Sequence, residues 1–177
     1  MGEFSPNLRL LTKSESDQDR VGLRYQFEGA RGVSNEYRPT NVGFGVSYTL
    51  PVVLAILAAQ PGDLLLIEAP EAHLHPRGQA KVGELMALAA ESGVQLLVET
   101  HSDHVLNGVR IAVHQRVLHP LNAGFFYFQW DPKRADGATS VQRLSVDSRG
   151  RLDPWPEGFF DEMDRSLEIL LSPQPET

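Results

Sequence analysis

The hydrophobic pattern of the chain is dominated by two short apolar runs, each of which ends in a carboxylate. Residues 64–67 (LLLI) precede Glu68, and residues 95–98 (QLLV) precede Glu99. Runs of this length and composition are typical of buried strands in a parallel sheet. Pro70 cannot continue a ladder of backbone hydrogen bonds, so we expect the chain to turn there. The pattern predicts two core strands that carry polar residues at their carboxyl ends.

Apolar positions at helical spacing follow each of the two runs. The first set begins after Pro76 and stops at Gly93, and the second begins after Ser102, which is the expected N-cap of its helix. The order strand, helix, strand, helix predicts a right-handed βαβ unit of a parallel sheet. Residues 68–75 and 99–104 should then leave the sheet at the same edge, where open α/β sheets bind ligands.

A turn that contains glycines is predicted before the first apolar run. Residues 41–48 (NVGFGVSY) precede apolar positions at helical spacing, so we expect a helix with Ser47 as its N-cap and Pro51 near its start. Such a turn is either an anion site made of backbone N–H groups or an ordinary turn with a capped core helix. Likewise, Glu68 is either a functional carboxylate or the solvated end of a core strand.

The two ends of the chain show weaker patterns. Alternation over residues 21–28 predicts a half-buried strand, and residues 8–11 predict a short one, while residues 13–20 have the composition of a solvated loop. An aromatic strand at 124–130, a loop at 131–137 and an alternating stretch at 141–145 predict a hairpin, in which the aromatic run has a packing role. A final amphipathic helix is expected through the apolar positions Met163, Leu167, Ile169 and Leu170.

These patterns together predict an α/β protein with a parallel sheet and flanking helices, followed by a β-hairpin and a C-terminal helix; the family resemblance given below implies that the sheet is a partial P-loop NTPase sheet. We expect three parts: a flexible or partly ordered segment at 1–20, the α/β lobe at 21–120, and the hairpin with the last helix at 121–177.

Composition narrows the function classes. The formal charge of −7 and the lack of a cluster of basic residues argue against direct nucleic-acid binding, so DNA or RNA would be contacted only through other chains. The absence of cysteine excludes disulfides and thiolate chemistry and fits a reducing compartment. No apolar run is long enough to span a membrane and no signal peptide opens the chain, so we expect a cytoplasmic protein.

Several stretches in a fixed order resemble the C-terminal lobe of an ABC-class, AAA-type ATPase of the SMC, RecF and OLD-like kind. The turn at 43–47 is similar to the signature motif, residues 64–68 to the Walker B strand, and residues 99–102 (ETHS) to the switch segment. The EAHLHP segment at 71–76 is similar to the continuation of Walker B in the OLD and RecF-like branch. The resemblance covers about residues 21–165, and WPEGFFDE at 155–162 is similar to the end of a prokaryotic subgroup that carries a C-terminal domain of unknown function.

The resemblance implies binding of ATP and Mg²⁺ and a role for particular residues. It implies that Glu68 holds Mg²⁺ through water and that His101 senses the γ-phosphate. Because the family's water-activating glutamate is missing at position 69, either Glu71 is the base in its place or hydrolysis is slow. The resemblance further implies that the turn, through Gly43, Gly45 and Ser47, caps a γ-phosphate bound on an opposing subunit.

Two departures from the family pattern change the expectation. Ala69 stands where many ABC-class ATPases have the glutamate that activates water, and a methyl group accepts no proton. No GxxxxGK[ST] segment occurs in the 177 residues, so the lysine and the backbone cradle for the phosphates are missing. We therefore interpret the chain as the C-terminal half of such an ATPase, cut by cloning, by truncation of the gene or by an alternative start, and inactive by itself. Its expected partner is an N-terminal P-loop lobe or a second copy of the chain.

Two alternatives remain open from sequence. One is a regulatory or interaction lobe that hydrolyses nothing, which Ala69 and the missing P-loop both favour. The other is a metal-dependent hydrolase, whose ligands would come from the histidines and the acid near the strand ends, namely His73, His75, His101, Asp103 and His104.

Overall fold

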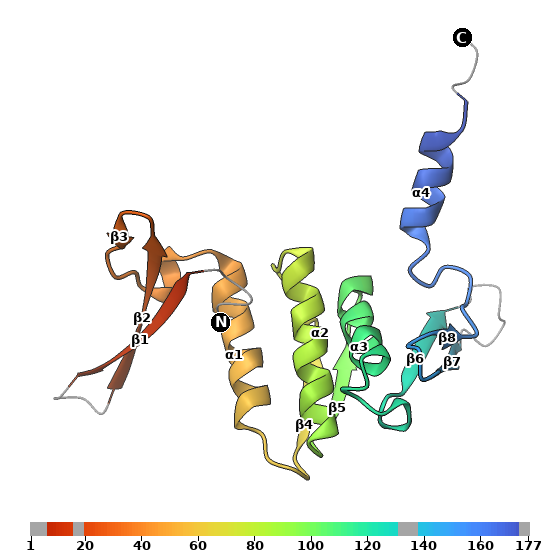
Figure 1. Cartoon of the computed structure of the whole chain (residues 1–177), viewed down its shortest axis with the longest axis horizontal. Coiled ribbons are helices and arrows are strands. Elements are labelled where there is room, and N and C mark those ends of the chain that lie inside the picture. The colour runs from red at the N-terminus through yellow and green to blue at the C-terminus, as the bar shows by residue number, and fades with distance from the viewer. Residues whose placement is uncertain (1–6, 16–19, 131–137, 174–177) are drawn as a thin grey trace.

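A computed structural model describes residues 7–15, 20–130 and 138–173 of the chain. The chain runs from an N-terminal hairpin, through three helices that stand side by side, to a second antiparallel sheet and a projecting last helix (Figure 1). The elements in chain order are β1 (Leu8–Glu15), β2 (Arg20–Gly29), β3 (Gly32–Val33), η1 (Pro39–Asn41), α1 (Phe44–Ala58), β4 (Leu64–Glu68), α2 (Pro76–Glu91), β5 (Gln95–Glu99), α3 (Asp103–His114), η2 (Pro120–Asn122), β6 (Phe125–Trp130), β7 (Thr139–Val146), β8 (Leu152–Asp153) and α4 (Glu162–Leu171). The expected α/β class is confirmed.

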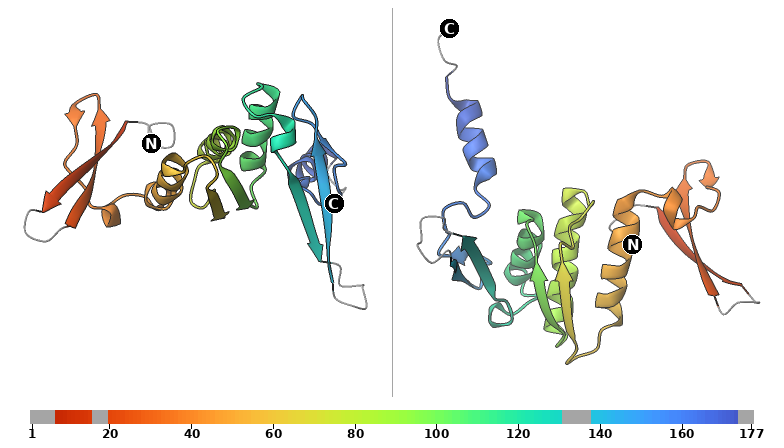
Figure 2. Two further views of the ribbon diagram at one scale, coloured as in Figure 1. Left: turned by 90° about the horizontal axis from the view of Figure 1, so that it is seen from below. Right: turned by 180° about the vertical axis from the view of Figure 1, so that it is seen from behind.

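The centre of the fold is the predicted β4–α2–β5–α3 unit. Strands β4 and β5 pair in parallel, with Glu68 opposite Glu99 at their carboxyl ends. Helices α2 and α3 lie on one face of this pair, and α1 stands beside α2 (Figure 2). Ile67 points into the cluster that these elements bury together with Ile56, Val82, Met86, Ala89, Val94 and Val105.

The opposite face of the β4–β5 pair is open. It carries Leu64, Leu66 and Leu97, of which Leu66 is 70% and Leu97 is 65% exposed. Parallel sheets are usually covered on both faces, because helices pack on either side of them. This apolar face therefore has the character of a surface that another layer of protein covers, and we call it the open face.

Helices α2 and α3 approach each other closely at two glycines. A methyl group at Gly83 would lie 2.3 Å from the carbonyl oxygen of Val105, and one at Gly108 would lie 2.1 Å from that of Ala80. Only residues without a Cβ permit backbones to come this near. The relative position of the two helices, and with it that of the loops at their N-termini, is thus fixed by contacts between their backbones.

The start of α1 differs from the prediction. The N-cap is Gly43, not Ser47, and Ser47 lies within the first turn, where its hydroxyl donates to the carbonyl oxygen of Pro39 at 3.1 Å. Pro51 is consequently well inside the helix rather than near its start. The hydroxyl of Ser47 bonds to the preceding 3₁₀ turn, so it is not used for capping.

The N-terminal segment is more regular than the sequence suggested. Strands β1 and β2 form an antiparallel hairpin in which residues 13–15, predicted as loop, continue β1. Residues 16–19 of that predicted loop lie outside the described residues. Tyr25 of β2 is almost fully buried against Leu8 and Leu50, which joins the hairpin to α1.

The C-terminal part contains the expected hairpin, β6–β7, extended by the short strand β8. One face of β6 packs inward through Phe125 and Tyr127, together with Leu144 of β7. The other face leaves Phe126, Phe128 and Trp130 exposed, so the packing role expected of the aromatic run holds for only half of it. The predicted loop at 131–137 lies outside the described residues. Helix α4 forms as predicted but buries none of its residues (Figure 1).

Candidate functional site

The polar ends of β4 and β5 meet at one edge of the sheet. Glu68 and Glu99 are the last residues of their strands, are paired in register, and are both exposed. The ladder continues one step beyond them, because the Ala69 N–H donates to the Glu99 carbonyl oxygen at 3.0 Å. The predicted convergence of the two polar segments is therefore confirmed.

The loop after β4 (residues 69–75, hereafter the tip loop) turns back sharply. Its Ala69 and His73 adopt positive φ values of 42° and 62°, a region that residues other than glycine enter rarely. The turns are closed by backbone hydrogen bonds from Ala72 to Ala69 and from Leu74 to Glu71, each 3.0 Å long. The tip loop thus has a defined shape that it keeps at a conformational cost, and such a shape requires support from its surroundings.

Glu71 provides part of this support. One carboxylate oxygen accepts a hydrogen bond from the Thr100 hydroxyl at 2.7 Å, and the other accepts one from the His101 N–H at 2.9 Å. The Thr100 hydroxyl oxygen also accepts from the Ser102 N–H at 3.1 Å. The carboxylate that the sequence suggests as a base is therefore, in this arrangement, a bridge between the tip loop and the end of β5.

His101 extends from the same edge into solvent. Its side chain is 89% exposed, and its Nε2 lies 3.0 Å from a carboxylate oxygen of Glu99. The imidazole is accessible to a ligand, and its only contact with an acid in the described residues is with Glu99. Glu68, Glu99 and His101 together make the end of the sheet a polar, solvent-facing surface.

The turn at residues 43–47 (hereafter the glycine turn) packs against the tip loop. A Cβ atom on Gly45 would lie only 2.6 Å from the carbonyl oxygen of His73, whereas one on Gly43 would meet nothing within 4 Å. The ring of His73 lies 4.9 Å from that of Tyr48 and 5.7 Å from that of Phe44. The structure thus brings the start of α1 and the tip loop into direct contact, as the sequence order alone did not require.

Two further polar side chains, Ser102 and Gln79, support the tip loop, and neither was predicted from the sequence as a residue of the site. The Ser102 hydroxyl caps α3 by accepting from the Val105 N–H, and it donates to the Gln79 side-chain oxygen at 2.6 Å. The Gln79 amide nitrogen in turn donates to the Leu74 carbonyl oxygen at 2.9 Å. Gln79 precedes Val82 by three positions on the inward face of α2, and a polar residue on an apolar face is the signal that could have identified it.

The histidines proposed as metal ligands do not converge. His75 caps α2 through its Nδ1, the His73 ring packs against Tyr48 at an angle of 50°, and His104 lies 3.7 Å from Asp103. Within residues 7–15, 20–130 and 138–173, no three His, Asp or Glu side chains are grouped to hold a metal ion. This arrangement does not support the metal-dependent hydrolase. A Mg²⁺ ion bound with a nucleotide is a different case, because it needs only one or two carboxylates beside phosphate oxygens and water, and Glu68 at the sheet edge fits that requirement.

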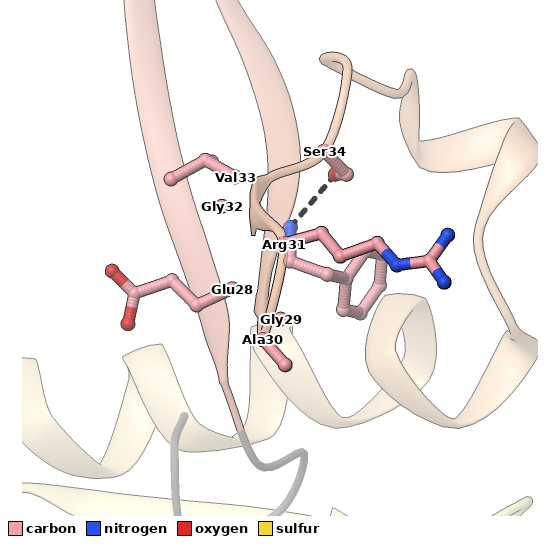
Figure 3. A pocket seen from close by; sticks show the side chains of 8 residues that line it. Glu28, Gly29, Ala30, Arg31, Gly32, Val33 and Ser34 are labelled. Carbon is pink, nitrogen blue, oxygen red and sulfur yellow. Dashed lines mark hydrogen bonds between the residues drawn. The ribbon is translucent and has the colours of Figure 1, made fainter.

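The hollow in Figure 3 is separate from these strand ends. It has a volume of about 450 Å³ and is lined by residues 27–34 at the turn between β2 and β3. Glu28 and Arg31 point to opposite sides of this turn (Figure 3), and Glu28 is already paired with Arg9. The Phe27 N–H donates to the Ser34 hydroxyl oxygen at 3.0 Å. The groups here stabilise the hairpin and do not converge on a ligand.

The fold is that of a portion of an SMC-type ATPase head. It is similar to a structure described as "Structural biochemistry of ATP-driven dimerization and DNA stimulated activation of SMC ATPases", with 17% identity and a TM-score of 0.57 over 98% of this chain and 88% of that one. It is also similar to an SmcHead bound to the C-winged helix domain of ScpA, with 20% identity and a TM-score of 0.52 over 82% of this chain and 40% of that one. A third is an Smc head domain with an extended coiled coil bound to the C-terminal domain of ScpA, derived from Pyrococcus furiosus, with 19% identity and a TM-score of 0.51 over 97% of this chain and 35% of that one. The chain thus spans less than half of the latter two proteins.

Family comparison places the chain more narrowly. A family model described as "AAA domain, putative AbiEii toxin, Type IV TA system" matches residues 4–107, more than half of the chain, and the chain belongs to this family. A second model, "Protein of unknown function (DUF3696)", matches residues 118–170. No curated protein matches the chain. In the part of the chain that the structure describes, no helix has the length and apolar character needed to cross a membrane.

Proposed function

We propose that this chain is the C-terminal, nucleotide-handling lobe of an ABC-class ATPase that acts through ATP-dependent dimerisation. The observation that carries the proposal is the joined edge of the sheet. There the ends of β4 and β5 lie in register, Glu71 connects them, and the glycine turn of α1 packs on the tip loop. Membership of an AAA family and the likeness to SMC heads support an ATP-binding module with this arrangement.

Each residue has a role in the proposal that its position permits. Glu68, exposed at the end of β4, holds Mg²⁺ through water, and the ion supplies charge neutralisation for the phosphates. His101 reaches into solvent from β5 and contacts the γ-phosphate. Gly43 and Gly45 offer free N–H groups at the N-terminus of α1 to a nucleotide on the opposing subunit. Ser47 joins them only if its hydroxyl exchanges the hydrogen bond to the Pro39 carbonyl for one to that nucleotide. Glu71 is the nearest candidate base, and to act as one it must exchange the Thr100 or His101 hydrogen bond for water.

Two features favour a P-loop lobe as the partner: the open face, and the edge of β5 that pairs with no other strand in the described part of the chain. Such a lobe, from the same polypeptide or from another chain, supplies the lysine and phosphate cradle that the 177 residues lack. It also covers Leu64, Leu66 and Leu97 and removes an unpaired strand edge. Nucleic acid, if it is contacted, is contacted through other parts of the assembly, because the chain carries a formal charge of −7. We further propose that the WPEGFFDE segment at 155–162 marks the prokaryotic subgroup named above, which the match at residues 118–170 supports.

The test is ATP turnover and ATP-dependent dimerisation of this chain joined with its P-loop lobe, which is identified by reading the coding sequence upstream of Met1. Glu68→Gln should lower turnover by on the order of 100-fold, because it weakens the metal site. Glu168→Gln, the same change on the exposed surface of α4, is the control and should have no effect. If Glu68→Gln keeps both turnover and dimerisation, the proposal is wrong.

A non-catalytic lobe is the second candidate, and two observations favour it. Position 69 carries a methyl group, and both oxygens of Glu71 are engaged within the chain. On this reading the joined lobes bind MgATP and dimerise without turnover. The two candidates are separated by measuring binding and hydrolysis on one preparation, and turnover that is lost in Glu71→Gln would exclude the non-catalytic lobe.

A further inference from the structure

The side chain of Gln79 connects the tip loop to the N-terminus of α3, two parts that no backbone hydrogen bond joins among the residues that the structure describes. It sits in the first turn of α2, between the tip loop and the N-terminus of α3. We propose that Gln79 is a positioning residue that couples the His101 end of β5 to the glycine turn at the start of α1, with the tip loop as the element between them.

The chemistry of the neighbours fixes the orientation of the Gln79 amide. The Leu74 carbonyl can only accept, so the amide nitrogen faces it at 2.9 Å, and the amide oxygen therefore faces the Ser102 hydroxyl at 2.6 Å. Ser102 is 6% exposed, and its oxygen already accepts the capping bond from Val105. Its proton is free for Gln79 alone. Both ends of the amide are thus used, and neither can be exchanged without loss of a hydrogen bond.

The tip loop is held from two sides at consecutive carbonyl groups. The His73 carbonyl oxygen meets the Cα side of Gly45, where no Cβ could fit, and the next carbonyl, of Leu74, accepts from Gln79. A shift of the Gln79 amide that moves the Leu74 carbonyl therefore also moves the His73 carbonyl against α1. Packed contacts of this kind transmit displacement because there is no free space to absorb it.

A displacement can reach Gln79 from β5. Ser102 follows His101 directly, and its N–H bonds to the Thr100 hydroxyl, so a ligand that pulls on His101 also moves the Ser102 hydroxyl. This inference rests on the proposed function for its biological meaning. A nucleotide that His101 contacts on one lobe would alter the position of residues 43–47, which serve the nucleotide of the opposing lobe. The contact chain itself exists without nucleotide, and its test does not require one.

The experiment is a double-mutant cycle on the full 177-residue chain, read by amide chemical shifts and hydrogen exchange. Ser102→Ala removes the donor to Gln79, and Gln79→Met removes both hydrogen bonds at nearly constant volume. The reporter at the turn is the Val46 amide, which donates to Gly43, and the local reporter is the Leu74 amide. Gln60→Met is the control, because Gln60 bonds near the other end of α1 and not to the tip loop.

We expect Ser102→Ala to shift the Val46 resonance in the wild-type background and to leave it unshifted in the Gln79→Met background. Exchange at Leu74 should rise about fivefold in Gln79→Met, as the loss of one ordinary hydrogen bond implies. Gln79→Glu, which keeps an acceptor for Ser102 but turns an oxygen toward the Leu74 carbonyl, should move Leu74 and Val46 while the Val105 amide stays protected.

The proposal is overturned if Ser102→Ala shifts Val46 equally with and without Gln79, or if no Gln79 variant shifts it. A chain that fails to bind nucleotide when joined to a P-loop lobe would instead contradict the proposed function, and it would leave the result of the cycle standing. If Gln79→Met unfolds, Gln79→Glu decides alone: an unshifted Val46 resonance in that variant overturns the proposal.

Discussion

The contact between Gly45 and the tip loop gives the sharpest test of the site, through the substitution Gly45→Ala. Gly45 is the second residue of α1, where alanine is ordinarily the better helix former. The added methyl carbon, however, would lie 2.6 Å from the His73 carbonyl oxygen. Either α1 or the tip loop must move, and the tip loop is fixed on its other side by Gln79.

The expected magnitude follows from these opposing terms. An ordinary contact between carbon and oxygen begins at about 3.4 Å, so the backbones must separate by roughly 0.8 Å, and overpacking of this kind costs about 1–3 kcal/mol. Better helix propensity offsets at most about 1 kcal/mol of it, and less in the first turn. We expect a net loss of about 1–2 kcal/mol in the free energy of unfolding. For a chain of this size that lowers the melting temperature by about 2–4 °C per kcal/mol.

The matched control is Gly78→Ala, in the first turn of α2. Its methyl group would lie 3.5 Å from a side-chain carbon of Leu74, which is an ordinary van der Waals contact with the same tip loop. This variant should gain about 0.5–1 kcal/mol from helix propensity. Both are measured by urea unfolding of the full chain, with circular dichroism at 222 nm as the signal. If Gly45→Ala is as stable as Gly78→Ala, the contact with His73 does not exist as described and the site must be redrawn.

Three further outcomes are expected. Gly108→Ala should cost more than Gly45→Ala, about 3 kcal/mol or above in urea unfolding, because its methyl group would lie 2.1 Å from a backbone oxygen of α2. The pKa of Glu91 is lowered by the hydrogen bonds that its carboxylate accepts from the His119 N–H and the Asn122 amide. Its stabilisation is therefore fully present above the pKa that this carboxyl has in the unfolded chain and is lost as the pH falls through the lowered value. The free energy of unfolding, measured for both proteins in parallel between pH 6 and pH 3, should therefore fall more steeply for the wild type than for Glu91→Gln; equal slopes would refute this. Leu66→Lys on the open face should change the unfolding free energy by less than about 0.5 kcal/mol yet weaken calorimetric binding of a P-loop lobe about tenfold or more, and unchanged binding would exclude that face as the docking surface.

The sequence predicted well those elements whose signals are local and agree with one another. Strands β4 and β5 are short apolar runs that end at Glu68 and Glu99, and α3 begins directly after Ser102, a good N-cap that precedes an apolar period. Because parallel strands joined by a helix place their carboxyl ends at one edge, the meeting of the two polar segments followed from topology alone.

The errors arose where tertiary contacts outweigh local preference. Ser47 has the residue type of an N-cap, but its hydroxyl reaches the Pro39 carbonyl, and the glycine before the helix provides the N-terminal boundary instead. Residues 13–15 are polar and still form a strand, because pairing with β2 satisfies their backbone groups. The partners of Gln79 could not be predicted for a related reason, although its place on an apolar face was a signal: Leu74 and Ser102 are distant from one another in sequence, and only the packing of α2 against α3 brings them together.

The contacts that stabilise the lobe lie apart from the surfaces that are open to a partner. The helices are joined on one side of the sheet by backbone contacts at Gly83 and Gly108, and the strand ends are joined by Glu71 and Gln79. None of these contacts uses the open face or the outward side of the sheet edge, where the carboxylate of Glu68 is exposed. A second lobe could therefore dock on the open face without breaking any hydrogen bond at the strand ends. The free-energy cost of association would then be mainly the loss of translational and rotational freedom of the two lobes. Under the proposed function, the site residues are pre-positioned by the lobe's own structure, so a P-loop partner would add the phosphate cradle and not the arrangement of the groups around it.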